Sequence, residues 1–161
     1  MTAVCPVRAA LRARGLTLPD PPAPAGGYER VRLVRGMGVL SGQFPLRDGR
    51  LGFIGRVGAE LTEAEGHAAA ELAALNVLAQ LDAALRGFSR LAGLLRVDGY
   101  VASAEGWVRQ PAVLDGASAL LVAALGERGR HARAALGVPR LPFDAPVELV
   151  VSFVAAEAGC G

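Results

Sequence analysis

The chain has 161 residues, of which 52% are hydrophobic and 5% aromatic, so we expect one domain with a core of Ala, Leu and Val. Its formal net charge is +2, and its 17 basic residues are all Arg, because the chain contains no Lys. This composition excludes a Schiff-base lysine and a P-loop, and it lacks the basic footprint of a dedicated nucleic-acid binder.

Cysteine and histidine are too sparse to predict a metal site. Cys5 and Cys160 lie near the two ends of the chain, and His67 and His131 each stand alone. We therefore expect no metal and no cofactor. A disulfide between the two cysteines stays open, although it is not the default for a chain without a signal peptide. No apolar run is expected to span a bilayer, which favours a cytoplasmic protein.

The N-terminal part is predicted to be a short helix followed by an extended connector. Apolar residues at helical spacing indicate a helix over residues 3–15, with Gly15 as its C-cap. The prolines of residues 18–27 fix an extended path and remove backbone donors. We therefore divide the chain into a helical extension, residues 1–19, and a main domain, residues 20–156.

Three strands are predicted next. Residues 28–35 alternate between polar and apolar side chains, and residues 39–43 form the partner strand of a hairpin. The Asp48-Gly49 pair predicts a second turn. Residues 51–57, which glycines interrupt, are predicted to form the third strand.

Two helices and a strand follow. Thr62 and Glu65 form a capping box that starts a long helix ending near Arg86. Residues 91–103 are apolar and predict a central strand. Residues 110–125, with a proline in the first turn, predict a second helix.

The last two strands, residues 131–138 and 147–154, carry the best chemical clue in the sequence. Each contains a lone charge in an apolar run, Arg133 in the first and Glu148 in the second. Such charges cost free energy unless they are paired, solvated or used. An exposed, weak Arg–Glu pair is the alternative to a functional role.

Alternation in the final strand separates its two faces. One face carries Val147, Leu149, Val151 and Phe153, and the other carries Glu148, Val150, Ser152 and Val154. The first set suits a core under helices. The order of elements then predicts an α+β two-layer domain, with two main helices on one face of one sheet. The other, apolar face predicts an oligomer.

Short motifs in a fixed order resemble those of the RidA/YjgF family, in the branch labelled endoribonuclease L-PSP or translation initiation inhibitor. The matching pieces are Gly27-Tyr28, Ser41-Gly42-Gln43-Phe44-Pro45, Ala74-Leu75-Asn76, Asp115-Gly116-Ala117-Ser118, Gly129-Arg130-His131-Ala132-Arg133, Leu141-Pro142 and Val147-Glu148. The resemblance covers about residues 20 to 155. The resemblance implies a chorismate-mutase-like fold with one mixed sheet, and a homotrimer with ligand pockets between neighbouring subunits.

The resemblance also implies a chemistry and residue roles. RidA proteins hydrolyse enamine and imine intermediates, such as 2-aminoacrylate, to a 2-keto acid and ammonia without a metal or cofactor. Arg133 matches the substrate-binding arginine, whose fork suits a carboxylate. Glu148 matches the acidic residue that orients or deprotonates the attacking water. Tyr28 matches a tyrosine that lines the pocket, and Gly42 would offer a backbone N–H to the ligand.

Two positions depart from the family pattern. The thiol often found two residues after the arginine is Ala135, and the position that is often Asn matches Asp115, which we place among the substrate-binding residues. An added anion there would weaken carboxylate binding or change the ligand. Two alternatives therefore stay open. One is a non-catalytic trimer that binds a small carboxylate, and the other, ranked lowest, is an endoribonuclease or translation inhibitor. No membrane or nucleic-acid partner is expected.

Overall fold

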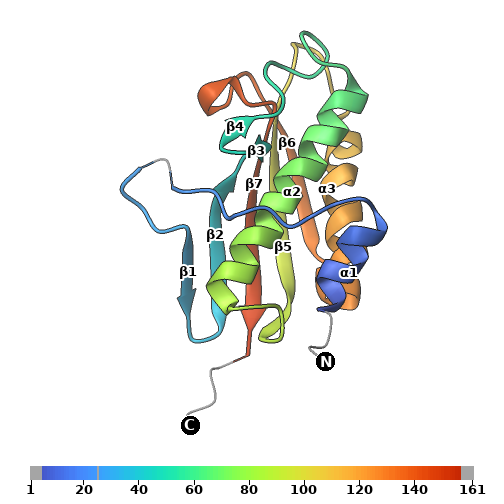
Figure 1. Cartoon of the computed structure of the whole chain (residues 1–161). Coiled ribbons are helices and arrows are strands. Elements are labelled where there is room, and N and C mark those ends of the chain that lie inside the picture. Colours follow the sequence, from blue (N-terminus) through green and yellow to red (C-terminus); the bar gives the residue numbers. More distant parts are fainter. Residues whose placement is uncertain (1–4, 25, 157–161) are drawn as a thin grey trace.

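The computed structural model describes residues 5–24 and 26–156, which form one mixed sheet with helices on one side (Figure 1). The elements, in chain order, are α1 (Pro6–Ala13), β1 (Val31–Val34), β2 (Met37–Gln43), β3 (Leu46–Arg47), β4 (Arg50–Leu51), α2 (Glu63–Leu85), β5 (Leu91–Ala102), α3 (Gln110–Leu125), the 3-10 turn η1 (Gly126–Gly129), β6 (Ala132–Val138), the 3-10 turn η2 (Pro142–Asp144) and β7 (Val147–Ala155).

The main sheet has five strands in the order β1-β2-β7-β5-β6. Only β5 and β6 run parallel to each other, and the other neighbours are antiparallel. A parallel pair needs a crossover connection, and α3 provides it. Figure 1 shows α2 and α3 side by side on one face. The predicted α+β two-layer fold with one mixed sheet is confirmed.

The long helix begins at the predicted capping box. The Thr62 hydroxyl accepts from the backbone N–H of Glu65, and the Glu65 carboxylate accepts from the backbone N–H of Thr62. These bonds satisfy donors that have no partner inside the helix. The helix ends at Leu85, and its C-cap residue Arg86 adopts a left-handed conformation (φ 55°) before Gly87.

By length and composition α2 could cross a membrane, so the expectation that no run is long and apolar enough was too strict. Its most apolar window has a mean hydropathy of 1.3, and 67% of that window is buried inside the protein. The apolar character of α2 is therefore that of a core helix between the sheet and α3.

The first helix packs its apolar residues into the same core. Val7 and Leu11 of α1 are each 1% exposed. From α1 the chain turns at Gly15 and crosses the outer side of α2, as Figure 1 shows. Division of the chain at residue 19 stays a prediction.

The predicted third strand over residues 51–57 is wrong. The chain instead forms a small hairpin of β3 and β4, closed at the expected turn by Asp48 (φ 51°) and Gly49 (φ 75°). After it, Val57 makes only isolated bridges. Gly55 and Gly58 have φ angles of 108° and 84°, which an extended strand does not allow. The first predicted strand also begins later, at Val31 instead of residue 28.

The face of the sheet opposite the helices is open in this chain. By register, outward-facing residues include Met37, Val39 and Leu136, which are 54%, 48% and 42% exposed. By contrast, the predicted core face of β7 is fully buried: Val147, Leu149, Val151 and Phe153 are all 0% exposed. We call the outward side the open face.

Candidate functional site

Arg133 and Glu148 lie on different faces of the sheet and on strands that are not neighbours. Strand β5 separates β6 from β7. Arg133 is paired in register with Val97, which is 0% exposed and faces the helices. Glu148 is paired with Tyr100 on the open face. The exposed Arg133–Glu148 pair considered from the sequence is therefore not formed within this chain.

The guanidinium of Arg133 is held by α3. Its Nη1 atom lies 2.9 Å from Oδ1 of Asp115 and 3.1 Å from Oγ of Ser118, and Nη2 donates to the carbonyl of Pro111 at 3.4 Å. The Arg133 side chain is 24% exposed, whereas that of Asp115 is 64% exposed. Side-chain and backbone groups of α3 therefore hold the Arg133 guanidinium. The carboxylate with which it pairs, that of Asp115, is exposed to solvent.

A hydrogen-bond chain continues behind the arginine. Ser118 Oγ lies 3.0 Å from Nε2 of His131, and Nδ1 of His131 lies 2.6 Å from the carbonyl oxygen of Gly129. A carbonyl only accepts, so Nδ1 carries a proton. In neutral His131, Nε2 is then the acceptor for the Ser118 hydroxyl, whose oxygen is free to accept from Arg133. This order of donors orients the guanidinium.

Sequence reasoning gave Ser118 no role. Its spacing from Asp115 could have indicated a role, because residues three apart on a helix, such as these two, share a face. Their common partner, Arg133, comes from the edge strand β6. We call Arg133, Asp115 and Ser118 the arginine half-site.

Glu148 is half-buried and lies against Gly42 of β2. A β-carbon at position 42 would overlap Oε1 of Glu148, so any larger residue there would require the carboxylate to move. Burial raises the pKa of Glu148 above its ordinary value, because the charged form loses hydration. A carboxyl with a raised pKa is a stronger base once it is deprotonated.

Tyr28 and Gly42 line one small cavity of about 80 Å³. Tyr28 is 50% exposed and precedes β1, so it is not a strand residue as predicted. Phe44 and Phe143 close the cavity with an edge-to-face contact, with ring centroids 5.9 Å apart. We call Tyr28, Gly42 and Glu148 the acidic half-site.

Two buried amides hold the cavity wall in place. Gln80 of α2 donates to the carbonyl of Pro22 at 2.8 Å and to Oε1 of Gln43 at 3.4 Å, and Gln43 donates to the carbonyl of Ser41 at 2.9 Å. These bonds tie the proline-rich connector to β2. The connector is therefore part of the wall of the cavity beside Tyr28 and Gly42, which Glu148 itself does not line.

The sequence predicted no metal site and left a Cys5–Cys160 disulfide open, and neither question involves a residue of the two half-sites. Within residues 5–24 and 26–156, no group of three or more His, Cys, Asp or Glu side chains could hold a metal ion. Cys160 lies outside the described residues, so its pairing with Cys5 stays a prediction.

Comparison with known proteins gives close matches over nearly the whole chain. Protein TCP17 of Trypanosoma cruzi is 41% identical over 145 residues, which are 89% of this chain and 90% of that protein. The crystal structure of Atu1372 from Agrobacterium tumefaciens, a protein of unknown function, is 37% identical and has a TM-score of 0.88. It covers 94% of this chain and 93% of that one.

A more distant structure carries the RidA name. RidA from the Antarctic bacterium Psychrobacter sp. is 26% identical, with a TM-score of 0.58, and covers 83% of this chain and 92% of that one. Residues 8–157 match the family described as "YjgF/chorismate mutase-like, putative endoribonuclease". The order of motifs, the fold and these matches agree, and the chain belongs to the YjgF/chorismate mutase-like family.

Proposed function

We propose that the protein hydrolyses reactive enamine and imine intermediates, such as 2-aminoacrylate and the 2-imino acids that are tautomers of such enamines, to 2-keto acids and ammonia without a cofactor. Membership of the YjgF/RidA family supports a small-molecule-processing or endoribonuclease-like role. Hydrolysis of imines is a more specific proposal than this family role. It is supported above all by the half-buried Glu148, whose raised pKa and contact with Gly42 suit a general base.

Arg133 would bind the substrate carboxylate. A guanidinium presents several donors in one plane and matches a carboxylate with two parallel hydrogen bonds. In this chain one of its terminal nitrogens already contacts Asp115 and Ser118. The substrate would therefore use the remaining donors or displace the exposed Asp115.

The proposed reaction is balanced without a metal or an oxidant. It starts from the iminium, which an imine forms by taking a proton from solvent on nitrogen and an enamine by taking one on its β-carbon. Glu148 takes a proton from water while the water oxygen bonds to C2 of the iminium, whose C=N π electrons move to nitrogen. Glu148 then returns its proton to that nitrogen. The C–N bond breaks, the hydroxyl oxygen forms the C=O bond, and its proton leaves with ammonia as ammonium. The iminium carbon is already electrophilic, so positioning and one base suffice.

We propose that two copies of the chain form this site together. Arg133 and Glu148 are separated by β5 and point to opposite faces, which argues against one pocket within a single chain. We propose a homotrimer in which the open face of one subunit packs against its neighbour, so that an acidic half-site meets the arginine half-site of the next copy. The exposed apolar residues of the open face support this packing.

The test of the reaction is ammonia and keto-acid release from imines generated in situ by an amino-acid dehydratase or oxidase. We expect the wild type to accelerate release, and Arg133→Ala and Glu148→Gln to lose the acceleration. Saturable keto-acid binding without acceleration would instead favour the non-catalytic carboxylate-binding protein. RNA cleavage that Glu148→Gln abolishes would favour the endoribonuclease of the family description.

The test of the shared site is complementation. Arg133→Ala and Glu148→Gln chains are inactive alone, but an oligomer formed from both contains some sites with an intact residue from each copy. Co-expressed mixtures should therefore regain part of the activity. Mixtures that remain inactive, while co-purification through a tag on one variant shows that mixed oligomers form, would place both residues in one copy's site.

A further inference from the structure

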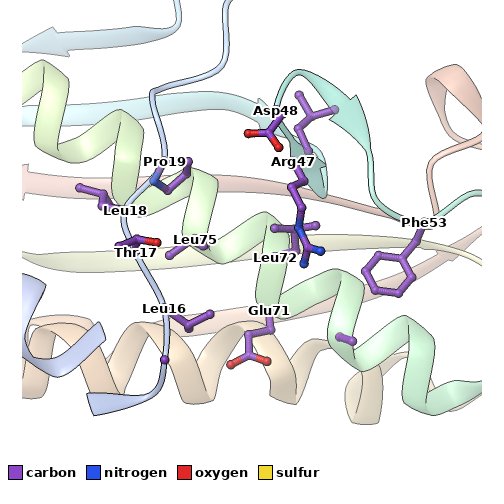
Figure 2. Close-up of a pocket in the computed structure, with 13 residues that line it drawn as sticks. Leu16, Thr17, Leu18, Pro19, Arg47, Asp48, Phe53, Glu71, Leu72 and Leu75 are labelled. Carbon is purple, nitrogen blue, oxygen red and sulfur yellow. The ribbon is translucent and has the colours of Figure 1, made fainter. Parts of the chain in front are cut away.

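A second cavity lies on the outer side of α2. It shares Leu46 with the small cavity beside Tyr28, although none of its lining residues belongs to either half-site. Its volume is about 420 Å³, within the usual size of small-molecule pockets. Figure 2 shows its three walls: the connector from Gly15 to Pro19, the outer side of α2, and the β3–β4 hairpin. The connector wall belongs to the N-terminal region that precedes the family motifs quoted above.

The floor of this outer pocket is apolar. Leu16, Leu18, Phe53 and Leu72 are only partly buried, although all four pack against the core, and Leu75 is 8% exposed. Their exposed carbon surface faces the cavity. Removing such surface from water favours binding of an apolar ligand. A ligand of this pocket therefore needs an apolar part that can cover this surface.

Both side walls are anchored to the protein. The buried amide of Asn76 donates to the carbonyls of Phe44 and Leu46, both at 2.9 Å, and so holds the base of the hairpin on α2. On the other side, the backbone N–H of Leu16 donates to the carbonyl of Leu11 at 2.9 Å. The cavity is thus preformed, and a ligand would not have to order its walls.

The mouth of the pocket carries a cation, Arg47, that is available to a ligand. Figure 2 shows the side chain of Arg47 reaching from the hairpin toward Leu72 of α2. Across the described part of the chain, the Arg47 guanidinium has no ion-pair or hydrogen-bond partner, whereas Glu71 is already paired with Arg14 at 3.2 Å. Asp48 also lines the mouth. Its negative charge would reduce the affinity for an anion, but the Arg47 guanidinium would still be available to donate hydrogen bonds.

We propose that the outer pocket binds a small amphipathic carboxylate, with its apolar chain on Leu72, Leu75 and Phe53 and its carboxylate on Arg47. An arginine beside apolar surface satisfies both ends of such a molecule. This site is separate from the proposed imine chemistry and does not depend on it. Its α2 wall lies on the side of the sheet opposite the open face (Figure 1).

Calorimetric titration of the full chain with octanoate, up to millimolar concentration, tests the proposal. Arg47→Gln removes the proposed fork, and Arg50→Gln is its matched control, because Arg50 faces Arg47 across the hairpin but does not line the pocket. Leu72→Trp fills the cavity from α2 and should also weaken binding. Circular dichroism of each variant checks that it is folded.

We expect saturable binding of octanoate to the wild type, to Arg50→Gln and to Arg133→Ala. Binding should be about tenfold weaker in Arg47→Gln, as is usual for a lost charge-assisted hydrogen bond. Absence of saturable binding would overturn the proposal. So would equal affinity of Arg47→Gln and Arg50→Gln, equal binding of octylammonium, or loss of binding in Arg133→Ala, which would move the ligand to the arginine half-site.

Discussion

The carboxylate of Glu148 occupies the space that a side chain at position 42 would need. The two residues come from neighbouring antiparallel strands, β2 and β7, which meet at an irregularity between Leu40 and Gln43. Gly42 lies within this irregularity, and the half-buried carboxylate lies against it. Glycine at 42 therefore leaves the carboxylate in its present position.

Gly42→Ala should displace Glu148 and remove activity while the protein stays folded. A misplacement of about 1 Å at a reacting group can cost about a hundredfold in rate. The measurement is imine hydrolysis together with the melting temperature. Gly27→Ala is the matched control, because a β-carbon at position 27 meets no atom within 4 Å. Equal activity of the two variants would refute the role given to Gly42.

Glu148→Gln should make the protein more stable at neutral pH. Burial raises the pKa of Glu148 in the folded state above its value in the unfolded chain. The folded state therefore holds the proton more tightly, and the wild type loses stability as the pH rises through the folded-state pKa. The gain from glutamine should shrink toward about pH 4, where glutamate is protonated in both states. Urea unfolding of both proteins at several pH values measures this difference.

Asp115→Asn should strengthen carboxylate binding and change stability little. The Asp115 side chain is 64% exposed, and exposed ion pairs contribute less than about 1 kcal/mol. Removing its charge frees Arg133 for an external carboxylate, so the Kd for pyruvate should fall a few-fold in calorimetric titration. Asp82→Asn is the control, because Asp82 pairs with Arg8 at 2.8 Å far from the site. Weaker pyruvate binding in Asp115→Asn would show that Asp115 serves to orient Arg133.

Gly116→Ala should destabilise the protein, against the helix preference of the two residues. Alanine in a helix interior is favoured over glycine by about 1 kcal/mol. At position 116, however, a β-carbon would overlap the backbone carbonyl oxygen of His67, where α2 and α3 approach closely. Backbone cannot move aside as a flexible side chain can, so the clash should prevail. The reverse change at the exposed Ala119 of the same helix, Ala119→Gly, isolates the propensity effect in a thermal melt.

Sequence alone determined the elements whose signals are local. The capping box at Thr62 and Glu65 marked the start of α2, and the two-residue alternation of residues 147–154 predicted which face of β7 is buried. Both depend on hydrogen bonds or side-chain directions within a few residues. Motif order also indicated the family, whose members share the fold.

Only the tertiary structure decided how the charged residues are placed. Consecutive strands in the sequence suggested that Arg133 and Glu148 are neighbours, yet β5 lies between them and the parallel pairing of β6 turns Arg133 toward α3. Strand order and register depend on contacts between residues far apart in the chain, which no local pattern encodes. The partnership of Arg133 with Asp115 and Ser118, the contact of Glu148 with Gly42, and the outer pocket under Arg47 all follow from that long-range packing.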